Sequence, residues 1–260
     1  MRAATRLVPV GVMLALAAAA TVALRPGSVA VAGADPLQVV RGQQVYQLKC
    51  QTCHLASGLG QPDKQIPSLH GVGAAAVDFY ISTGRMPEAN YSPQARRGPV
   101  TVSPADKDAL IAFITTTWPG GPDIPTIDLE NADLVNGGDL FRTNCAPCHG
   151  AVGAGAALAN GAYAPSLHRA TPLQVAEAIR VGPGNMPVFD QGTLSDAQVS
   201  DIVAYVQYLR HPNDRGGAGL GWVGPIAEGF VGLVIGLAGV VGIAAWVGHR
   251  NENEPVEHHG

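Results

Sequence analysis

Two copies of the pentapeptide Cys-x-x-Cys-His, at residues 50–54 and 145–149, hold all four cysteines of this 260-residue chain. Two thiols one helical turn apart, with a histidine directly after them, are typical of covalent haem attachment. The thiols can form thioethers with the two vinyl groups of a haem, and the histidine can then supply one axial nitrogen to the iron. The pattern predicts two covalently attached haem c groups, bound through Cys50, Cys53, Cys145 and Cys148, with His54 and His149 as iron ligands.

Three other chemistries use paired cysteines. A zinc site takes four ligands, which two such pairs could supply, but the repeat places each pair in a domain of its own. A thioredoxin-like dithiol belongs to an α/β domain, for which the sequence gives no pattern. Disulfide bonds would leave the histidine after each second cysteine unexplained, so haem attachment is the favoured interpretation.

The repeat extends well beyond the pentapeptides. Residues 67–70 and 165–168 both read Pro-Ser-Leu-His, and residues 84–87 and 184–187 both read Gly-x-Met-Pro. Each copy ends in a segment with helical hydrophobic spacing, preceded by a capping serine and followed by a proline. The chain is therefore expected to contain two homologous helical domains.

Met86 and Met186 occupy equivalent positions of this repeat, and the other two methionines lie near the N-terminus. A thioether opposite an imidazole stabilises ferrous iron and raises its reduction potential, so both methionines are predicted to be axial ligands. The alternative is that each only fills the core. His70 and His168 are also equivalent and are rival ligands, although a place near a haem propionate or at the surface is favoured.

Pro67 and Pro165 are predicted to offer their carbonyl oxygens to the second ring nitrogen of His54 and His149. Such a bond fixes the orientation and the tautomer of a ligating histidine. The alternative is that both are ordinary loop prolines. The first repeat also has a longer gap after its methionine, from Met86 to Ser103. We interpret this extra segment, which contains Arg96-Arg97, as a solvated insertion, with a docking loop as the alternative.

Two uncharged stretches flank the repeat. Residues 7–24 follow a basic start and can form a signal peptide or a membrane anchor. Residues 229–248 carry no charge, and at about 1.5 Å per residue they can span the roughly 30 Å hydrocarbon core of a bilayer. Gly232 and Gly236 within this segment are spaced as in helices that pack closely in membranes. Charged residues make up only 14% of the chain, against about 25% in average soluble proteins, which agrees with partial immersion in lipid.

The charge balance excludes one class of function. Sixteen basic and twenty acidic residues give a net charge of −4. A protein that neutralises nucleic-acid phosphates needs clustered lysines and arginines. We therefore expect no nucleic-acid partner.

Each repeat resembles a small class I cytochrome c, with a helix, Cys-x-x-Cys-His, Pro-x-Leu, Gly-x-Met-Pro and a terminal helix in that order. The whole chain resembles the dihaem cytochrome c subunit of the actinobacterial cytochrome bcc complex, a menaquinol–cytochrome c reductase. The resemblance implies an all-α fold with two tandem class I cytochrome c domains, a C-terminal transmembrane helix and an N-terminal signal or anchor helix. It also implies that Gly42 and Gly137 let the first helix of each domain cross closely beneath the last helix, against Phe113 and Tyr205.

The same resemblance implies a membrane-anchored carrier that passes electrons from a Rieske centre to a terminal oxidase of the aa3 type. The implied partners are cytochrome b, the Rieske iron–sulfur subunit and that oxidase. Such a chain is the electron-transfer subunit of a quinol–cytochrome c reductase and has no catalytic site of its own. The alternatives are a cytochrome subunit of another membrane dehydrogenase or oxidase, and a dihaem peroxidase, whose open iron position Met86 and Met186 would block.

Haem attachment takes place outside the cytoplasmic membrane, so both haem domains are expected on the extracytoplasmic face and the C-terminus in the cytoplasm. The expected organisation is a signal peptide or anchor at 1–34, cytochrome c domains at 36–118 and 129–211, a Pro-rich linker at 119–128, a Gly-rich linker at 212–228, a transmembrane helix at 229–248 and an acidic tail at 249–260.

Overall fold

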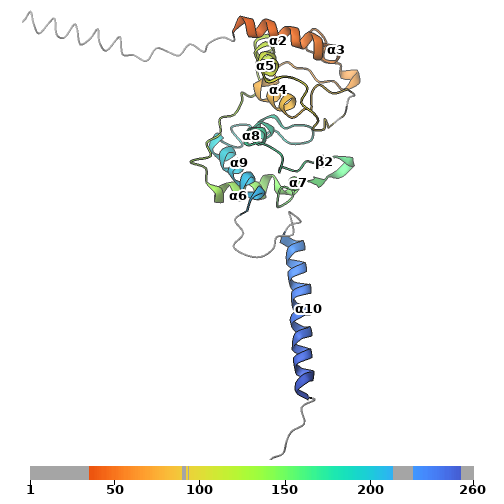
Figure 1. Cartoon of the computed structure of the whole chain (residues 1–260). Coiled ribbons are helices and arrows are strands. Elements are labelled where there is room, and N and C mark those ends of the chain that lie inside the picture. The colour runs from red at the N-terminus through yellow and green to blue at the C-terminus, as the bar shows by residue number, and fades with distance from the viewer. Residues whose placement is uncertain (1–34, 90–91, 93, 213–224, 253–260) are drawn as a thin grey trace, which may run out of the picture.

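The computed structural model describes residues 35–89, 92, 94–212 and 225–252. The predicted leader, most of the Gly-rich linker and the end of the acidic tail lie outside these residues. Figure 1 shows two helical domains that follow one another along the chain, and one long separate helix. The prediction of a mostly helical fold with two cytochrome c domains and a C-terminal apolar helix is confirmed.

The first domain is built on two helices that cross near its N-terminus. Asp35 caps the first of them by accepting a hydrogen bond of 3.0 Å from the backbone N–H of Leu37, and Ser103 caps the last by accepting one of 3.1 Å from that of Asp106. The elements of this domain are α2 (Pro36–Lys49), α3 (Gln51–His54), the short 3-10 helix η1 (Pro62–Lys64), α4 (Gly73–Ser82) and α5 (Pro104–Thr117).

The second domain repeats this plan and adds a two-stranded antiparallel sheet. Both of its longer C-terminal helices begin with capping boxes, in which Thr171 pairs with Gln174 and Ser195 pairs with Gln198. The elements are α6 (Leu134–Asn144), α7 (Ala146–His149), β1 (Ala156–Ala157), the 3-10 helix η2 (Ala159–Gly161), β2 (Tyr163–Ala164), α8 (Pro172–Val181) and α9 (Asp196–Arg210).

In each domain the first helix crosses the last at a glycine. A Cβ atom on Gly42 would lie 1.9 Å from the carbonyl oxygen of Ala109, and one on Gly137 would lie 2.0 Å from that of Asp201. These distances are far below van der Waals contact, so only glycine allows the two backbones to approach this closely. The side chain of Tyr205 packs over Gly138, the residue after the crossing glycine.

Each domain has a hydrophobic core of its own around this crossing. Tyr46 and Leu110 are almost fully buried in the first core, and Phe141 and Ile202 occupy the corresponding places in the second. The two cores explain how one chain can hold two separate sites of the same design.

The two domains also pack against each other through α4 and α8. The Pro-rich linker lies along the first domain, where the carbonyl oxygen of Pro122 accepts a hydrogen bond of 3.1 Å from the backbone N–H of Ala75. The extra segment of the first domain touches the second domain as well: the side chain of Gln94 bonds to the backbone of Tyr163. The interpretation of this segment as a solvated insertion is therefore wrong, because it docks on the neighbouring domain.

The C-terminal helix α10 (Pro225–Glu252) is the longest element of the described chain. Its apolar part, Ile226–Arg250, is long enough to cross a membrane and buries none of its surface within the protein. Large apolar side chains such as Leu233, Ile235 and Trp246 are exposed on it. A helix of this composition needs either lipid or another protein around it.

Candidate haem sites

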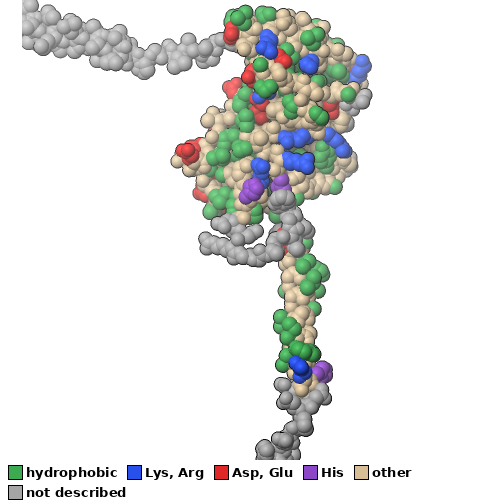
Figure 2. Space-filling model, viewed as in Figure 1, with side chains coloured by type: hydrophobic (Ala, Val, Ile, Leu, Met, Phe, Trp, Pro, Cys, Tyr) green, Lys and Arg blue, Asp and Glu red, His purple; other side chains and the backbone are tan. Residues whose placement is uncertain are grey.

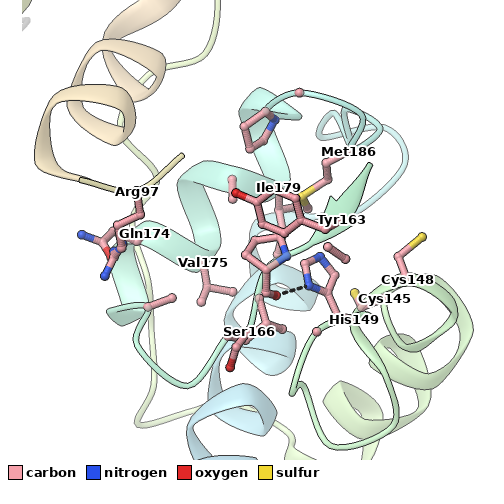
Figure 3. Close-up of a pocket in the computed structure, with 18 of the residues that line it drawn as sticks. Arg97, Cys145, Cys148, His149, Tyr163, Ser166, Gln174, Val175, Ile179 and Met186 are labelled. Atoms are coloured by element: carbon pink, nitrogen blue, oxygen red, sulfur yellow. Dashed lines mark hydrogen bonds between the residues drawn. The ribbon is translucent and has the colours of Figure 1, made fainter. Parts of the chain in front are cut away.

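His149 forms one wall of the site in the second domain. It ends α7 and is 8% exposed, and its Nδ1 lies 2.9 Å from the carbonyl oxygen of Pro165 (Figure 3). The Nδ1–H group therefore donates to this carbonyl, which leaves Nε2 as the nitrogen with a lone pair. Burial lowers the pKa of His149, so the neutral ring needed for iron coordination is favoured.

The two cysteines of the same motif differ in exposure. Cys145 is half-buried against the core, whereas Cys148 is exposed, and neither forms a disulfide bond in the described structure. Burial raises the pKa of the Cys145 thiol to about 11. Reactive dithiols have a thiol with a pKa well below the usual value of about 8.5, so the raised pKa of Cys145 argues against that role for this thiol.

Met186 reaches the same cavity from the loop after α8. Figure 3 shows its sulfur, His149 and the two cysteines around a common space. The cavity has a volume of about 1050 Å³, at the upper end of the roughly 300–1,000 Å³ typical of cofactor sites. Two thiols, one imidazole with a free lone pair and one thioether form a donor set that fits haem c.

The first domain places its residues in the same way. His54 is 9% exposed, and its Nδ1 lies 3.1 Å from the carbonyl oxygen of Pro67. Burial lowers the pKa of His54 and raises that of the Cys50 thiol to about 11. Cys50 and Met86 both pack against the first core, as Cys145 and Met186 pack against the second.

The two rival histidines have other partners. His70 Nε2 lies 2.8 Å from the carbonyl oxygen of Ser57, and the ring stacks on Trp118 with centroids 5.3 Å apart. His168 Nε2 lies 2.8 Å from the carbonyl oxygen of Val152. Each of these histidines thus bonds to the loop that follows the pentapeptide in its own domain, which argues against a role as an iron ligand.

The zinc alternative finds no support in the described part of the chain. The two cysteine pairs lie in different domains, and no group of three or more His, Cys, Asp and Glu side chains there is placed to hold a metal ion.

Several residues that line the second cavity were not predicted as site residues from the sequence. Tyr80, Arg85, Gln94, Arg96 and Arg97 all belong to the first domain, yet they line the cavity that contains His149 and Met186. The one signal in the sequence was the extra segment with its adjacent arginines. The hydrophobic spacing of a sequence predicts whether a segment is a helix or a strand, but it does not predict which surface a loop will contact.

The fold and the sites define c-type cytochrome domains, and comparisons with known families agree. Residues 39–118 match the family model "Cytochrome c", and residues 132–206 match "Cytochrome C oxidase, cbb3-type, subunit III". Both models describe cytochrome c domains, which carry covalently bound haem c. The covalent attachment predicted from the pentapeptides is therefore supported at the level of the domain.

Curated relatives cover most of the chain. The "cytochrome bc1 complex cytochrome c subunit" of Mycobacterium tuberculosis (strain ATCC 25618 / H37Rv) is 41% identical over 232 residues, or 86% of this chain and 82% of the relative. The protein of the same name from Corynebacterium diphtheriae is 36% identical over 241 residues, with coverage of 86% and 85%. The chain belongs to the family of cytochrome bc1 complex cytochrome c subunits.

A more distant match has another activity in its name. The "thiosulfate dehydrogenase" of Psychrobacter arcticus is 26% identical over 196 residues, or 64% of this chain and 57% of the relative. The lower identity and coverage do not favour the dehydrogenase alternative.

Proposed function

We propose that this chain is the membrane-anchored dihaem subunit that carries electrons out of a quinol-oxidising bc complex. The observation that carries the proposal is the repetition of one complete site in two domains: a buried histidine bonded to a proline carbonyl, two cysteines and a methionine on the same core. When bound, each haem supplies reversible one-electron chemistry. The family of the chain points to a bc complex as the place where this chemistry is used.

The residues have separate roles in this proposal. The four cysteines attach the two haems, and the carbonyl oxygens of Pro67 and Pro165 orient the ligating rings. His54 with Met86 would hold the haem iron of the first domain, and His149 with Met186 that of the second. With a neutral histidine and a thioether both available to each iron, peroxide chemistry, which needs an open iron position, is disfavoured.

The proposed partners follow from the same family. Cytochrome b and a Rieske iron–sulfur subunit would lie on the donor side, and a terminal oxidase of the aa3 type on the acceptor side. The chain is then the electron-transfer subunit of a quinol–cytochrome c reductase and contributes no independent catalytic site. Because two haem domains on one anchored chain stay close to donor and acceptor, a diffusing carrier is not needed.

The proposed topology places both haem domains outside the cytoplasmic membrane. Helix α10 would cross the bilayer and bring the C-terminus into the cytoplasm. Its exposed apolar side chains support insertion into lipid, and the site of haem attachment, outside the cytoplasm, supports the orientation.

Purification of the chain from native membranes under mild detergent tests this proposal. We expect b-type haem, a Rieske subunit and an aa3-type oxidase to copurify, and the chain to carry two haems by mass after denaturation. Recovery with a dehydrogenase and without b-type haem would contradict the assignment to a bc complex. In membranes, replacing either His54 or His149 should stop quinol-dependent oxygen uptake, since both domains are needed in series.

A further inference from the structure

The cavity of the second domain is completed by the first domain. Its floor holds Cys145, His149 and Met186, but part of its wall is formed by α4 and the extra segment of the first domain. The two domains thus share one site, although each has its own core and its own pentapeptide.

Hydrogen bonds hold the extra segment against the second domain. The side-chain N–H of Gln94 donates to the carbonyl oxygen of Tyr163 at 2.5 Å, and the N–H of Tyr163 donates to Gln94 Oε1 at 3.2 Å. Arg97 donates from Nη1 to the carbonyl oxygen of Arg169 at 3.0 Å and from Nη2 to the side chain of Gln174 (Figure 3). Four polar contacts of this kind fix the segment at the rim of the cavity.

The first domain also touches the loop that carries Met186. The side chain of Tyr80, on α4, lies beside the backbone of Gly184. A Cβ atom on Gly184 would meet the side chain of Gln94 at 3.4 Å. The methionine loop of one domain is therefore supported by side chains of the other.

The charges at this rim have one sign. Four arginines line the cavity, Arg85, Arg96, Arg97 and Arg169, and the lining contains no aspartate or glutamate among the described residues. Figure 2 shows basic side chains gathered at the level where the first domain meets the second. None of these four arginines forms an ion pair within the described chain.

Two of these arginines lie over aromatic rings, and one of the two is partly withdrawn from water. Arg85 is half-buried beside the ring of Phe79, with 4.9 Å between its guanidinium carbon and the ring centroid. Arg96 lies over the ring of Tyr163 at 5.2 Å. An anionic group in the cavity would therefore meet four guanidinium groups and no carboxylate of the described chain.

A haem carries two propionate carboxylates at one edge, and this rim has the charge to receive them. We propose that Arg85, Arg96 and Arg97 of the first domain, together with Arg169, bind the propionates of the haem held by the second domain. The inference rests on the proposed second haem and goes beyond it, because it makes one domain part of the haem site of the other. Planar guanidinium groups suit carboxylates, which they can bind through two parallel hydrogen bonds.

The competing explanation is that these arginines only hold the two domains together. A substitution that changes the charge, compared with one that keeps it, distinguishes the two explanations. A lysine keeps the positive charge beside a propionate but does not reproduce the paired hydrogen bonds of Arg97 with Arg169 and Gln174. Arg96, which makes no hydrogen bond of this kind in the described structure, is the cleaner position for a change of charge.

The experiment uses the full-length purified chain. Reduction potentials of both haems are measured between pH 5 and 9 in the wild type, Arg85→Gln, Arg96→Gln, Arg97→Gln and Arg96→Lys. The component of the second domain is identified as the one that moves in Met186→Leu. Arg142→Gln is the matched control, since Arg142 is an exposed arginine of the second domain that pairs with Asp139 outside the cavity.

We expect each Gln variant to lower the potential of the second-domain haem, because a nearby cation favours the reduced iron. The pH at which this potential changes should rise by about one unit or more, as the propionate loses a cation within a few ångströms. Arg96→Lys and Arg142→Gln should show neither change, and in Arg96→Gln and Arg97→Gln the haem of the first domain should stay close to its wild-type potential.

Two results would overturn the inference, and they are distinguishable. If Arg96→Gln and Arg96→Lys behave alike, or if neither potential nor its pH dependence moves in the Gln variants, the arginines do not bind propionates. If mass determination finds no haem on Cys145 and Cys148, the proposed second haem is itself wrong, and the arginine assignment fails with it.

Discussion

The hydroxyl of Tyr46 donates a hydrogen bond of 2.6 Å to the carbonyl oxygen of Leu55, the residue directly after His54. Leu55 has a φ of 64°, a left-handed conformation that residues with a Cβ atom rarely adopt. In the second domain the equivalent residues are Phe141, which has no hydroxyl, and Gly150, which adopts a φ of 77° without strain. The two domains thus make the same turn after the histidine by different means.

This pair predicts a double-mutant cycle. Tyr46→Phe should destabilise the first domain by about 1 kcal/mol, because the backbone loses a buried hydrogen bond at a strained residue. Leu55→Gly should relieve the strain and reduce the cost of Tyr46→Phe, so the two effects are coupled. Thermal unfolding of the four chains measures the coupling. Strictly additive effects would show that the hydroxyl does not support this turn.

The proposed iron ligands predict a change in ligand binding. Met186→Leu should open one iron to carbon monoxide and lower its potential, because the thioether no longer stabilises ferrous iron. Met86→Leu should do the same at the other haem, and the two variants serve as controls for each other. Absorption spectra with and without carbon monoxide give the result, and unchanged spectra in either variant would point to another ligand in that domain.

The crossing glycines predict a steric cost. Gly137→Ala would place a methyl group against the carbonyl oxygen of Asp201 and should destabilise the second domain by about 1–3 kcal/mol or more, as the two helices must separate. Gly192→Ala is the matched control, since the nearest atom to its Cβ would lie 3.5 Å away. Thermal unfolding measures both. A cost for Gly137→Ala no larger than that of the control would contradict the close crossing.

A buried acid predicts a pH-dependent stability. Glu177 on α8 is fully buried, and neither of its carboxylate oxygens has a hydrogen-bond partner in the described structure. Burial, and then the charge of Asp78 on α4, raise its pKa to about 8, while Lys107 on α5 acts in the opposite direction. The folded protein therefore keeps a proton that the unfolded chain releases near pH 4.5.

The contribution of Glu177 to stability should be complete below about pH 4.5 and should fall as the pH rises to about 8. Glu177→Gln stays neutral, so its free energy of unfolding should exceed that of the wild type by an amount that grows from pH 5 to pH 8. Urea unfolding at several pH values measures this difference. Glu130→Gln, at an exposed site, is the control, and parallel curves for wild type and Glu177→Gln would exclude a buried, protonated acid.

The sequence predicted what is local and repeated. The pentapeptides and the two methionines could be predicted because their chemistry depends on spacing within one domain, and the role of the crossing glycines followed from the resemblance to class I cytochromes c. The docking of Gln94 on Tyr163 could not be predicted, because the sequence of a short polar segment does not indicate which surface it will contact. Glu177 was missed for a related reason: the face of α8 that bears it is covered by the first domain, and an isolated amphipathic helix would leave that face in water.

The extra segment gives the two repeats an asymmetry with a consequence for assembly. From methionine to capping serine the first domain spans 17 positions, Met86 to Ser103, whereas the second spans 9, Met186 to Ser195. When two similar domains meet through different surfaces, in a head-to-tail contact, further domains can add in the same way and form a filament. In this chain only the first domain has the extra segment, and the residues that the segment contacts lie in the second domain. The contact therefore joins the first domain to the second, and the described part of the second domain has no equivalent segment with which to repeat it.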